Sequence, residues 1–579
     1  MTNEAYMIPT SKKEVGLLGW DYIDVIIFSG DAFIDHPSFG TAVIARTLQS
    51  QGYRVAVVPQ PNWRDDLRDF KKLGVPRLYF GVNSGAMDSM VNHYTANMRL
   101  RSDDAYTPEG KAGARPDYAV TVYTRILKSL YKDVPVVIGG IEASLRRFAH
   151  YDYWKNCLLP SILVDSGADF LTYGMGEKST IELTRAIDNG EDTFSLPQVA
   201  RYYKGFEAND PLFQGERYIT LQSFEKALAN KRTFVENFNI IEREANRLTP
   251  CVLVEPYKEG VLVVNPPYPP ATEQEMDEMA ELPYTKLPHP RYKNKRIPAY
   301  DMIKFSITSH RGCFGGCSFC TIAAHQGRFI QSRSVDSVVK EAKALTQLPD
   351  FKGVISDVGG PTANMYMMGG KNKDHCAVCK RKSCLFPARC PNLDYSHKSL
   401  LNLYNGVEKV KGIKNFYIGS GIRYDLFLDN KGFLDATSKD YFNRLVKYHV
   451  SGRLKVAPEH TQDNVLRYLG KPSFSLFRTL RKEFDLFNKR ENKKYQLIPY
   501  FISSHPGCTL SDMAALSHEP SLQGVMTEQV QDFTPTPMTR SSAMFYSGLD
   551  TKNLKPIFVE RKQVDKKKQK SFFFKKKAL

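Results

Sequence analysis

Apolar runs alternate with helical periodicity through the first part of the chain. Residues 25–28 form a continuous apolar run, which is typical of a buried strand, and residues 41–51 show helical spacing that ends at Gly52. Further strand-like runs lie at residues 54–58, 77–80, 134–138 and 169–173. This order predicts an α/β unit, a Rossmann-like doubly wound domain over residues 1–264.

A second alternation follows between residues 299 and 550. Residues 302–307 alternate apolar and polar positions like a strand, and residues 334–345 carry apolar side chains at helical spacing behind Ser334, a plausible cap. Other strand-like runs lie at residues 353–357, 415–420, 453–457 and 496–502. Strands that alternate with helices favour parallel pairing, so we expect a partial βα barrel here.

Polar side chains follow three of these predicted barrel strands. They are Ser420 and Arg423, then Glu459 and His460, then Ser503, Ser504 and His505. Each one alone would suit a strand-end cap or a solvated loop. Because the carboxyl ends of parallel strands meet at one edge, their repeated placement favours a pocket there.

The two predicted domains are joined by a proline-rich segment, residues 265–298, with a charged middle at 273–281. Proline prevents a long regular element and the charges favour exposure, so we expect a linker or strap.

The chain has 579 residues, of which 42% are hydrophobic, so two or three domains with sizeable cores are expected. No apolar run approaches the ~18 residues needed to span a bilayer, and the first residues lack the apolar block of a secretory signal. These features predict a cytoplasmic protein without membrane contact.

The net charge of +18 is unevenly distributed. Residues 552–579 hold ten lysines and one arginine against two acidic residues, a net of +9. We therefore expect residues 551–579 to be a disordered basic tail with at most a weak attraction for RNA. The remaining charge permits an anionic substrate without requiring one.

Cys313, Cys317 and Cys320 stand in the run HRGCFGGCSFC. Three soft thiolates in one tight loop favour an iron–sulfur cluster over a hard metal ion. A [4Fe-4S] cluster has four corners, so three cysteines leave one iron open for chemistry. The alternative is a zinc site, which would want a fourth ligand close by, such as His310 or His325.

A second group, Cys376, Cys379, Cys384 and Cys390, lies in an insertion at about residues 371–392. Four thiols in a segment without helical or strand periodicity favour a loop that is held together by a metal. Either zinc or an iron–sulfur cluster would suit four sulfur ligands. Free or redox-active thiols are the alternative. Neighbouring basic residues would offset the thiolate charge: Lys380, Arg381, Lys382 and Arg389.

The first cysteine run resembles the signature of the radical S-adenosylmethionine (SAM) superfamily, with Phe319 as the aromatic residue before the last cysteine. The resemblance implies that SAM fills the open iron site and yields a 5′-deoxyadenosyl radical. It also implies SAM contacts by Gly359 and Gly360, a strand-terminal glycine pair, and by Ser420 and Arg423. The superfamily's usual acidic third residue is Pro361 here.

Longer phrases extend the likeness to nearly the whole chain. They are SHRGCFGGCSFCTIAAHQGRFIQSRS, DVGGPTANMY, GSGIRYDL, VAPEHTQDNVLRYLGKP, YFISSHPGCT and VQDFTPTPMTRSSAMFYSG. Together they resemble the YgiQ family of radical SAM proteins. The first unit is similar to the Rossmann-like domain of cobalamin-dependent superfamily members. The histidine-ligand motif D-x-H-x-x-G is absent, however, because Asp35 and His36 are adjacent, so we expect no bound cobalamin.

The sequence thus predicts a radical SAM enzyme that uses a [4Fe-4S] cluster and SAM on an unidentified substrate, with an electron donor such as a flavodoxin or ferredoxin. Within this class, the runners-up are a methylthiotransferase-like enzyme and a cobalamin-dependent modification enzyme. A non-enzymatic alternative is an iron–sulfur electron carrier or a zinc-dependent nucleic-acid-binding protein. A carrier would more naturally supply a fourth cysteine to each cluster.

Overall fold

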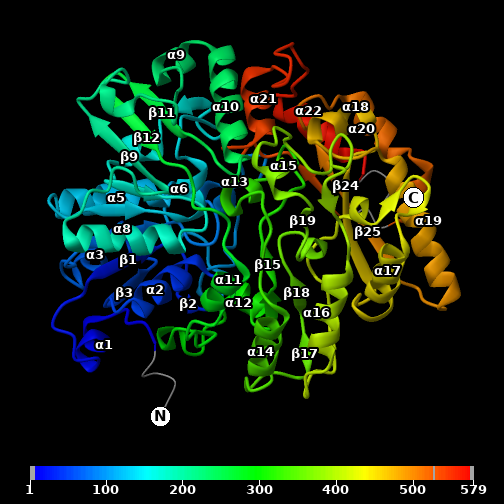
Figure 1. Cartoon of the computed structure of the whole chain (residues 1–579), viewed down its shortest axis with the longest axis horizontal. Coiled ribbons are helices and arrows are strands. Elements are labelled where there is room, and N and C mark those ends of the chain that lie inside the picture. The colour runs from blue at the N-terminus through cyan, green and yellow to red at the C-terminus, as the bar shows by residue number, and fades with distance from the viewer. Residues whose placement is uncertain (1–6, 526–528, 574–579) are drawn as a thin grey trace.

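The computed structural model describes residues 7–525 and 529–573 and shows two α/β halves side by side (Figure 1). A nine-stranded sheet forms the N-terminal half, in the order β10-β11-β12-β9-β8-β5-β4-β1-β3. Its first strands are parallel: β1 (Val25–Ser29), β3 (Val55–Pro59), β4 (Tyr79–Asn83), β5 (Val136–Ile138) and β8 (Phe170–Thr172). The rest of the sheet mixes orientations in β9 (Val199–Lys204), β10 (Tyr218–Thr220), β11 (Val252–Tyr257) and β12 (Gly260–Val264).

Helices cover both faces of this sheet, as the predicted doubly wound domain requires. Successive residues of β1 point to opposite faces, with Ile26 and Phe28 in one core and Val25 and Ile27 in the other. The first core includes residues of α5 (Ala119–Leu130), and the second includes residues of α2 (Gly40–Ser50) and α8 (Glu177–Asn189).

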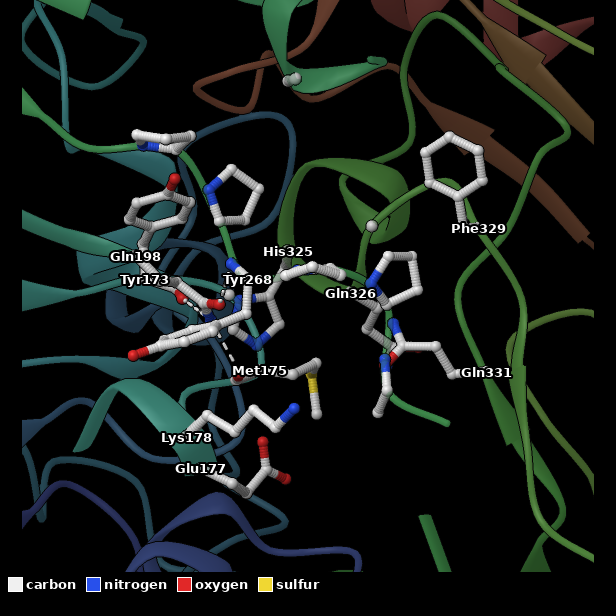
Figure 2. Close-up of a pocket in the computed structure, with 18 of the residues that line it drawn as sticks. Tyr173, Met175, Glu177, Lys178, Gln198, Tyr268, His325, Gln326, Phe329 and Gln331 are labelled. Atoms are coloured by element: carbon white, nitrogen blue, oxygen red, sulfur yellow. Dashed lines mark hydrogen bonds between the residues drawn. The ribbon is translucent and has the colours of Figure 1, made fainter. Parts of the chain in front are cut away.

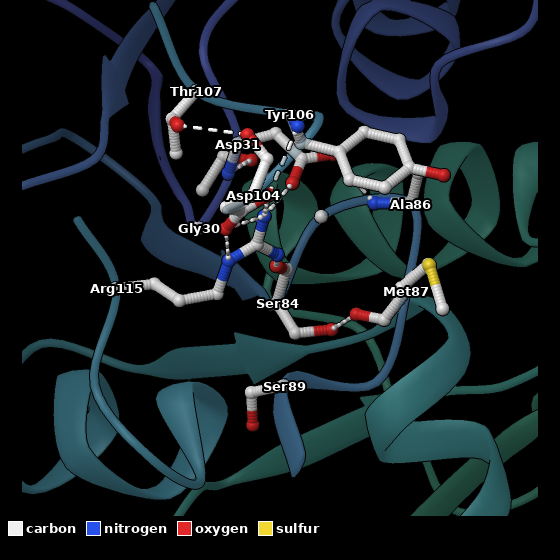
Figure 3. A network of polar contacts seen from close by, with 12 residues as sticks. Gly30, Asp31, Ser84, Ala86, Met87, Ser89, Asp104, Tyr106, Thr107 and Arg115 are labelled. Atoms are coloured by element: carbon white, nitrogen blue, oxygen red, sulfur yellow. Dashed lines mark hydrogen bonds and ion pairs between the residues drawn. The ribbon is translucent and has the colours of Figure 1, made fainter. Parts of the chain in front are cut away.

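A buried ion network fixes the loops at the carboxyl edge of the sheet (Figure 3). The Arg115 guanidinium contacts Asp31 at 2.8 Å and Asp104 at 3.0 Å, and its Nη1 donates to the Ser84 carbonyl at 2.7 Å. Gly30 packs so closely that a Cβ there would lie 2.2 Å from the Ser84 carbonyl oxygen. These contacts hold the loops after β1 and β4 together at the edge that faces the second half.

The second half is an open parallel array around one large core. It runs through β14 (Ser306–Thr308), β18 (Asp357–Gly359) with β17 (Val354–Ile355), β21 (Asn415–Phe416), β24 (Arg453–Glu459), β25 (Gln496–Ser503) and β26 (Gln529–Asp532). A parallel bridge from Ile422 to Val456 continues the array between β21 and β24. The intervening helices are α14 (Val335–Leu345), α16 (Lys398–Glu408), α17 (Ala436–Tyr448), α19 (Ser475–Arg490) and α20 (Leu510–Ser517). The predicted α/β class with a partial βα barrel is confirmed.

Two elements differ in detail from the sequence pattern. Residues 298–303 form α12 (Pro298–Ile303), so the first barrel strand is shorter than the predicted 302–307 run. Pro298 starts this helix, where its missing N–H costs no hydrogen bond. Ser334 caps α14 as predicted, because its side chain accepts from the backbone N–H of Ser337 at 3.1 Å.

The proline-rich segment packs along the domains as a strap. It contains α11 (Glu273–Ala280), which begins with a capping box formed by Thr272 and Glu275, and β13 (Leu287–Pro288), which pairs with β2 (Ile34–Asp35). The Tyr292 hydroxyl accepts a hydrogen bond from the Phe33 N–H at 3.1 Å, which anchors the strap to the N-terminal half.

The described part of the basic tail, residues 551–573, is folded, so the expectation of disorder is wrong there. Helix α22 (Gln563–Ser571) contacts α20, β25 and β26, and the Gln569 side chain accepts from the Ser504 N–H at 2.9 Å. Phe573 stacks on Phe501 with ring centroids 6.0 Å apart. The high lysine content led to the expectation of disorder, but Gln569 and Lys566 form a buried inner face of the helix. Residues 574–579 lie outside the described residues. None of the described helices is both long and apolar enough to cross a membrane.

Candidate active site

The three cysteines of the first motif lie on one loop between β15 (His310–Arg311) and α13 (Ile322–Gln326). Gly312 and Gly316 have φ values of +88° and +65°, which glycine adopts without strain, and they turn the loop back on itself. Burial raises the pKa of Cys320 to about 12, and the neighbouring Cys317 and Cys313 add to that shift by repulsion. The loop therefore gathers three thiols in one buried place.

Two cations stand beside this loop. Arg423 donates from Nη1 to the Cys317 sulfur at 3.3 Å, and its guanidinium is fixed by Asp425. Lys471 is buried and paired with Glu459 at 3.2 Å, and its charge lowers the cost of ionising Cys320. Buried thiolates need such compensation, so this surrounding suits an anionic thiolate–metal cluster.

Neither histidine considered for a zinc site joins the three cysteines. His310 is buried with its ring between the Ser309 hydroxyl and the Thr362 carbonyl, at 2.9 and 3.0 Å, and burial lowers its pKa to about 4. His325 contacts the Ser144 hydroxyl at 3.1 Å instead. Within the described residues, no three His, Cys, Asp or Glu side chains are already arranged around a metal position. The loop itself offers three soft sulfurs, and the two histidines are engaged elsewhere, which suits a cluster with one open iron.

The predicted glycine pair ends β18, next to the cysteine loop. A Cβ at Gly360 would lie 2.6 Å from the His310 ring, so this glycine is required by protein packing as well as by any ligand. The Ser420 hydroxyl donates to Asp357, whose carboxylate also accepts from the Gly419 N–H at 2.9 Å. Burial raises the pKa of Asp357. Gly359 packs next to Ser420, since a Cβ there would lie 3.3 Å from the Ser420 hydroxyl oxygen, so the pair and Ser420 form one wall.

This wall lines a cavity of about 560 Å³ between the two halves, named the central cavity here. Barrel residues on its surface include Thr308, Gly359, Gly360 and Ser420, while Asn83, Gly139 and Gly140 belong to the N-terminal sheet. These positions follow the carboxyl ends of β14, β18, β4 and β5, so the two sheets direct their carboxyl edges at one shared space. Ligands of parallel α/β sheets bind at such edges.

A second cavity of about 360 Å³, named the strap cavity, adjoins the first. Tyr173, Glu177 and Lys178 approach it from the N-terminal half, and Gln326, Phe329 and Gln331 from the segment after the cysteine loop (Figure 2). Met175, Glu177 and His325 line both cavities. The strap prolines at 266–270 close its remaining side.

The other predicted strand-end residues make internal contacts instead of lining the central cavity. Glu459 pairs with Lys471, His460 contacts the Cys508 sulfur at 3.6 Å, and Ser503 donates to Asp532 at 2.6 Å. Ser504 binds the tail helix through its backbone. The His505 ring contacts the Ser541 hydroxyl at 2.6 Å, and that hydroxyl donates to Ser318 on the cysteine loop at 2.8 Å. These two successive hydrogen bonds support the loop. Phe319 is partly buried between two cores.

The second cysteine group lies on an insertion closed by β19 (Gly369–Gly370) and β20 (Leu393–Asp394). Its cationic neighbour is Arg328, which donates to the Cys384 sulfur at 3.2 Å. Two of the four basic residues expected to play this part are engaged elsewhere: Lys382 pairs with Glu242, and Arg389 donates to the Asp425 carbonyl at 3.3 Å. Cys508 is buried.

Comparison with known proteins places this fold and site in a class. The family described as Radical SAM N-terminal matches residues 7–306. A UPF0313 protein of Bacteroides thetaiotaomicron is 54% identical over 98% of this chain and 93% of its own length. One of Methanocella arvoryzae is 47% identical over 95% of this chain and 90% of its own. The cobalamin-dependent SAM radical enzyme OxsB, solved with aqua-cobalamin and SAM, is similar in fold at 10% identity and a TM-score of 0.50, over 92% of this chain and 56% of that one.

The fold, the cysteine loop and the family match define a radical SAM enzyme. Within that class, the chain belongs to the UPF0313 family, which is the YgiQ family, so the resemblance seen in the sequence is confirmed.

Proposed function

We propose that Cys313, Cys317 and Cys320 hold three corners of a [4Fe-4S] cluster and that SAM occupies its fourth corner. When bound and reduced, this cluster supplies an electron that cleaves SAM to methionine and a 5′-deoxyadenosyl radical, which takes a hydrogen atom from an unidentified substrate. The observation that carries the proposal is the packing of the three-thiol loop behind the wall of the central cavity. The Cys313 sulfur lies 3.5 Å from the Thr362 hydroxyl, two residues after Gly360, and Gly359, Gly360 and Ser420 line the cavity.

The chain's own residues would bind and orient the ligands in this cavity. The backbone of Gly359 and Gly360 and the hydroxyl of Ser420 are offered as SAM contacts, since they line the cavity wall. Phe319 lies on the cluster loop itself and packs against the barrel core, so it would contact a bound cofactor from the loop. Arg423, which the sequence offered as a SAM contact, is instead proposed to position the cluster loop, because its guanidinium is already held by Asp425 and Cys317.

The central cavity would also protect a reactive radical from water. Its volume of about 560 Å³ falls within the range of about 300–1,000 Å³ usual for small-molecule sites. It is enclosed by both halves of the chain, so the substrate would enter between them. A one-electron carrier such as a flavodoxin or ferredoxin is the proposed partner for reduction.

The test is anaerobic turnover. Protein reconstituted with iron and sulfide, then given dithionite and SAM, is expected to form 5′-deoxyadenosine, detected by chromatography. Cys317→Ala is expected to form none while Cys251→Ser, a change at a cysteine far from the loop in sequence, is expected to match the parent. An intact cluster that yields no 5′-deoxyadenosine would contradict the proposal.

A corrinoid is the second candidate ligand of the central cavity, because OxsB binds cobalamin and the cavity lies at the carboxyl edge of the N-terminal sheet. Pro37 and Ser38 line the cavity, whereas the buried His36 ring turns back to accept from the Ser38 N–H at 3.1 Å. His36 is therefore not offered as a lower ligand, and absence of cobalamin stays our prediction. The visible absorbance of protein produced in the presence of cobalamin tests this prediction. Corrinoid that co-purifies with the protein would contradict it.

A further inference from the structure

The second cysteine group has the hydrogen-bond surroundings of metal-bound thiolates. Three of its four sulfurs accept from N–H donors. Cys379 accepts from the Arg381 backbone at 3.4 Å, Cys384 from the Arg328 guanidinium at 3.2 Å, and Cys376 from the Asn392 amide at 3.4 Å. Such donors stabilise the ionised form of sulfur and are the usual outer partners of metal-bound cysteine.

The Arg328 side chain supplies the strongest sign of a negative charge at this place. Arg328 is 5% exposed, and its described hydrogen-bond partners are the carbonyls of Asn246 and Arg381 and the sulfur of Cys384. A buried guanidinium without a carboxylate needs another anion, because burying an unpaired charge costs several kcal/mol. Thiolates bound to a metal would be that anion.

The backbone also brings the four cysteines together in two pairs. Cys376 and Cys379 lie at the end of α15 (Lys373–Ala377), joined by a hydrogen bond from the Cys379 N–H to the Cys376 carbonyl at 3.2 Å. Cys390 donates in the same way to the Cys384 carbonyl at 2.8 Å. Gly370 makes room, since a Cβ there would lie 2.2 Å from the Cys376 sulfur.

We propose that Cys376, Cys379, Cys384 and Cys390 bind a second metal centre through four thiolates, either one Zn²⁺ or one iron–sulfur cluster, distinct from the cluster on the first loop. Four sulfur ligands and no open position would make this centre structural or electron-transferring, not a second SAM site. In the described residues the sulfurs are not yet arranged around one point, so side-chain rotation would accompany metal uptake.

This centre would brace the first loop directly. The Cys384 N–H donates to the Phe314 carbonyl at 3.1 Å, and the Ser383 hydroxyl donates to the Gly315 carbonyl at 2.7 Å. A Cβ at Gly316 would lie 2.6 Å from the Lys382 carbonyl oxygen, so the two loops are in close contact. Loss of the second metal is therefore expected to loosen the loop that carries Cys313 and Cys317.

Metal content of the full-length protein, purified without oxygen, tests the second site independently of SAM chemistry. The variant Cys313→Ala/Cys317→Ala/Cys320→Ala removes the first site, and it is expected to retain about one zinc or about four iron per chain. Elemental analysis with the visible spectrum tells zinc from iron–sulfur. Adding Cys379→Ser and Cys384→Ser is expected to abolish the remaining metal, while adding Cys251→Ser is expected to leave it unchanged.

A milder variant covers the case in which those cysteine changes prevent folding. Arg328→Gln is expected to speed the loss of the second metal to a chelator by about 10- to 100-fold, as for other outer-shell partners. Arg389→Gln, whose guanidinium contacts a carbonyl instead of a sulfur, is the matched control and is expected to behave like the parent. A folded triple-alanine variant that contains neither zinc nor iron, or parent protein that releases to the chelator no metal beyond the about four iron of one cluster, would overturn the proposal.

Discussion

Gly360 packs so closely against His310 that any larger residue at position 360 would collide with it. The buried His310 ring lies where the glycine's Cβ would be, and the same ring binds the Thr362 carbonyl. Thr362 in turn places its hydroxyl 3.5 Å from the Cys313 sulfur. At the scale of single residues, the glycine wall and the cysteine loop are therefore packed as one unit.

Gly360→Ala is expected to destabilise the fold by about 1–3 kcal/mol, because the added methyl overpacks against the His310 ring and backbone. The displaced wall should also weaken SAM binding. Thermal unfolding and equilibrium dialysis with SAM measure the two effects. Gly421→Ala is the control, since a Cβ there meets nothing within 4 Å. Equal behaviour of the two variants would show that the packing at Gly360 is unimportant.

Arg423→Gln is expected to lower cluster retention at the first loop by about 10- to 100-fold, because it removes the N–H donor and the positive charge beside Cys317. Iron release to a chelator measures this under anaerobic conditions. Arg444→Gln on α17, which removes an ion pair with Glu408, is the comparison variant. Parent-like iron retention in Arg423→Gln would show that this contact does not support the cluster.

The residues that could be predicted at this scale are those that belong to short sequence motifs or follow a predicted strand. The three cysteines, the glycine pair and Ser420 are of that kind. Arg328 and Lys471 were not predicted, because each comes close to the cysteines from a distant part of the chain and a lone basic residue carries no spacing signal. Arg423 was found but given a different role, since a sequence shows no side-chain direction.

At the scale of elements, helix α22 closes the far part of the barrel. It inserts Gln569 between Ser504 and Cys508, to whose carbonyl the Gln569 amide donates at 3.3 Å. Lys566 reaches the Tyr153 hydroxyl in the N-terminal half at 3.2 Å. The helix thereby links both halves of the chain. Its high lysine content gave no indication of this role.

Truncation after residue 562 is expected to lower the melting temperature by several degrees, because it exposes the barrel residues that α22 covers and removes the Gln569 partner of the Ser504 N–H. Differential scanning calorimetry measures the shift. Truncation after residue 573 retains the helix and serves as the control. If both truncations melt like the full chain, α22 contributes nothing to stability.

At the scale of the whole molecule, the central cavity lies where the two halves meet and is lined by both. Arg311, next to the cysteine loop, pairs with Glu177 of α8 at 2.5 Å, and both side chains are largely buried. The His325–Ser144 contact lies close by, between α13 and α6 (Gly140–Leu145). The alternation of strands and helices could predict the two units, but their docking depends on pairs far apart in the sequence, which one sequence does not reveal.

Glu177→Gln is expected to weaken this docking by about 3–5 kcal/mol, because Arg311 would remain buried without a charged partner. Limited proteolysis within the strap, residues 265–298, should become faster as the halves separate. Lys178→Gln, which removes a more exposed pair with Glu275, should have a much smaller effect. Unchanged cleavage in Glu177→Gln would mean that the pair does not hold the halves together.

The most direct test of the account is the electron paramagnetic resonance spectrum of the reduced protein with and without SAM. A cluster held by Cys313, Cys317 and Cys320 has one iron open to SAM, so addition of SAM is expected to shift the signal. The Cys317→Ala variant, which lacks one corner of this cluster, should show no such shift. A reduced cluster on this loop whose spectrum is indifferent to SAM would contradict the central claim.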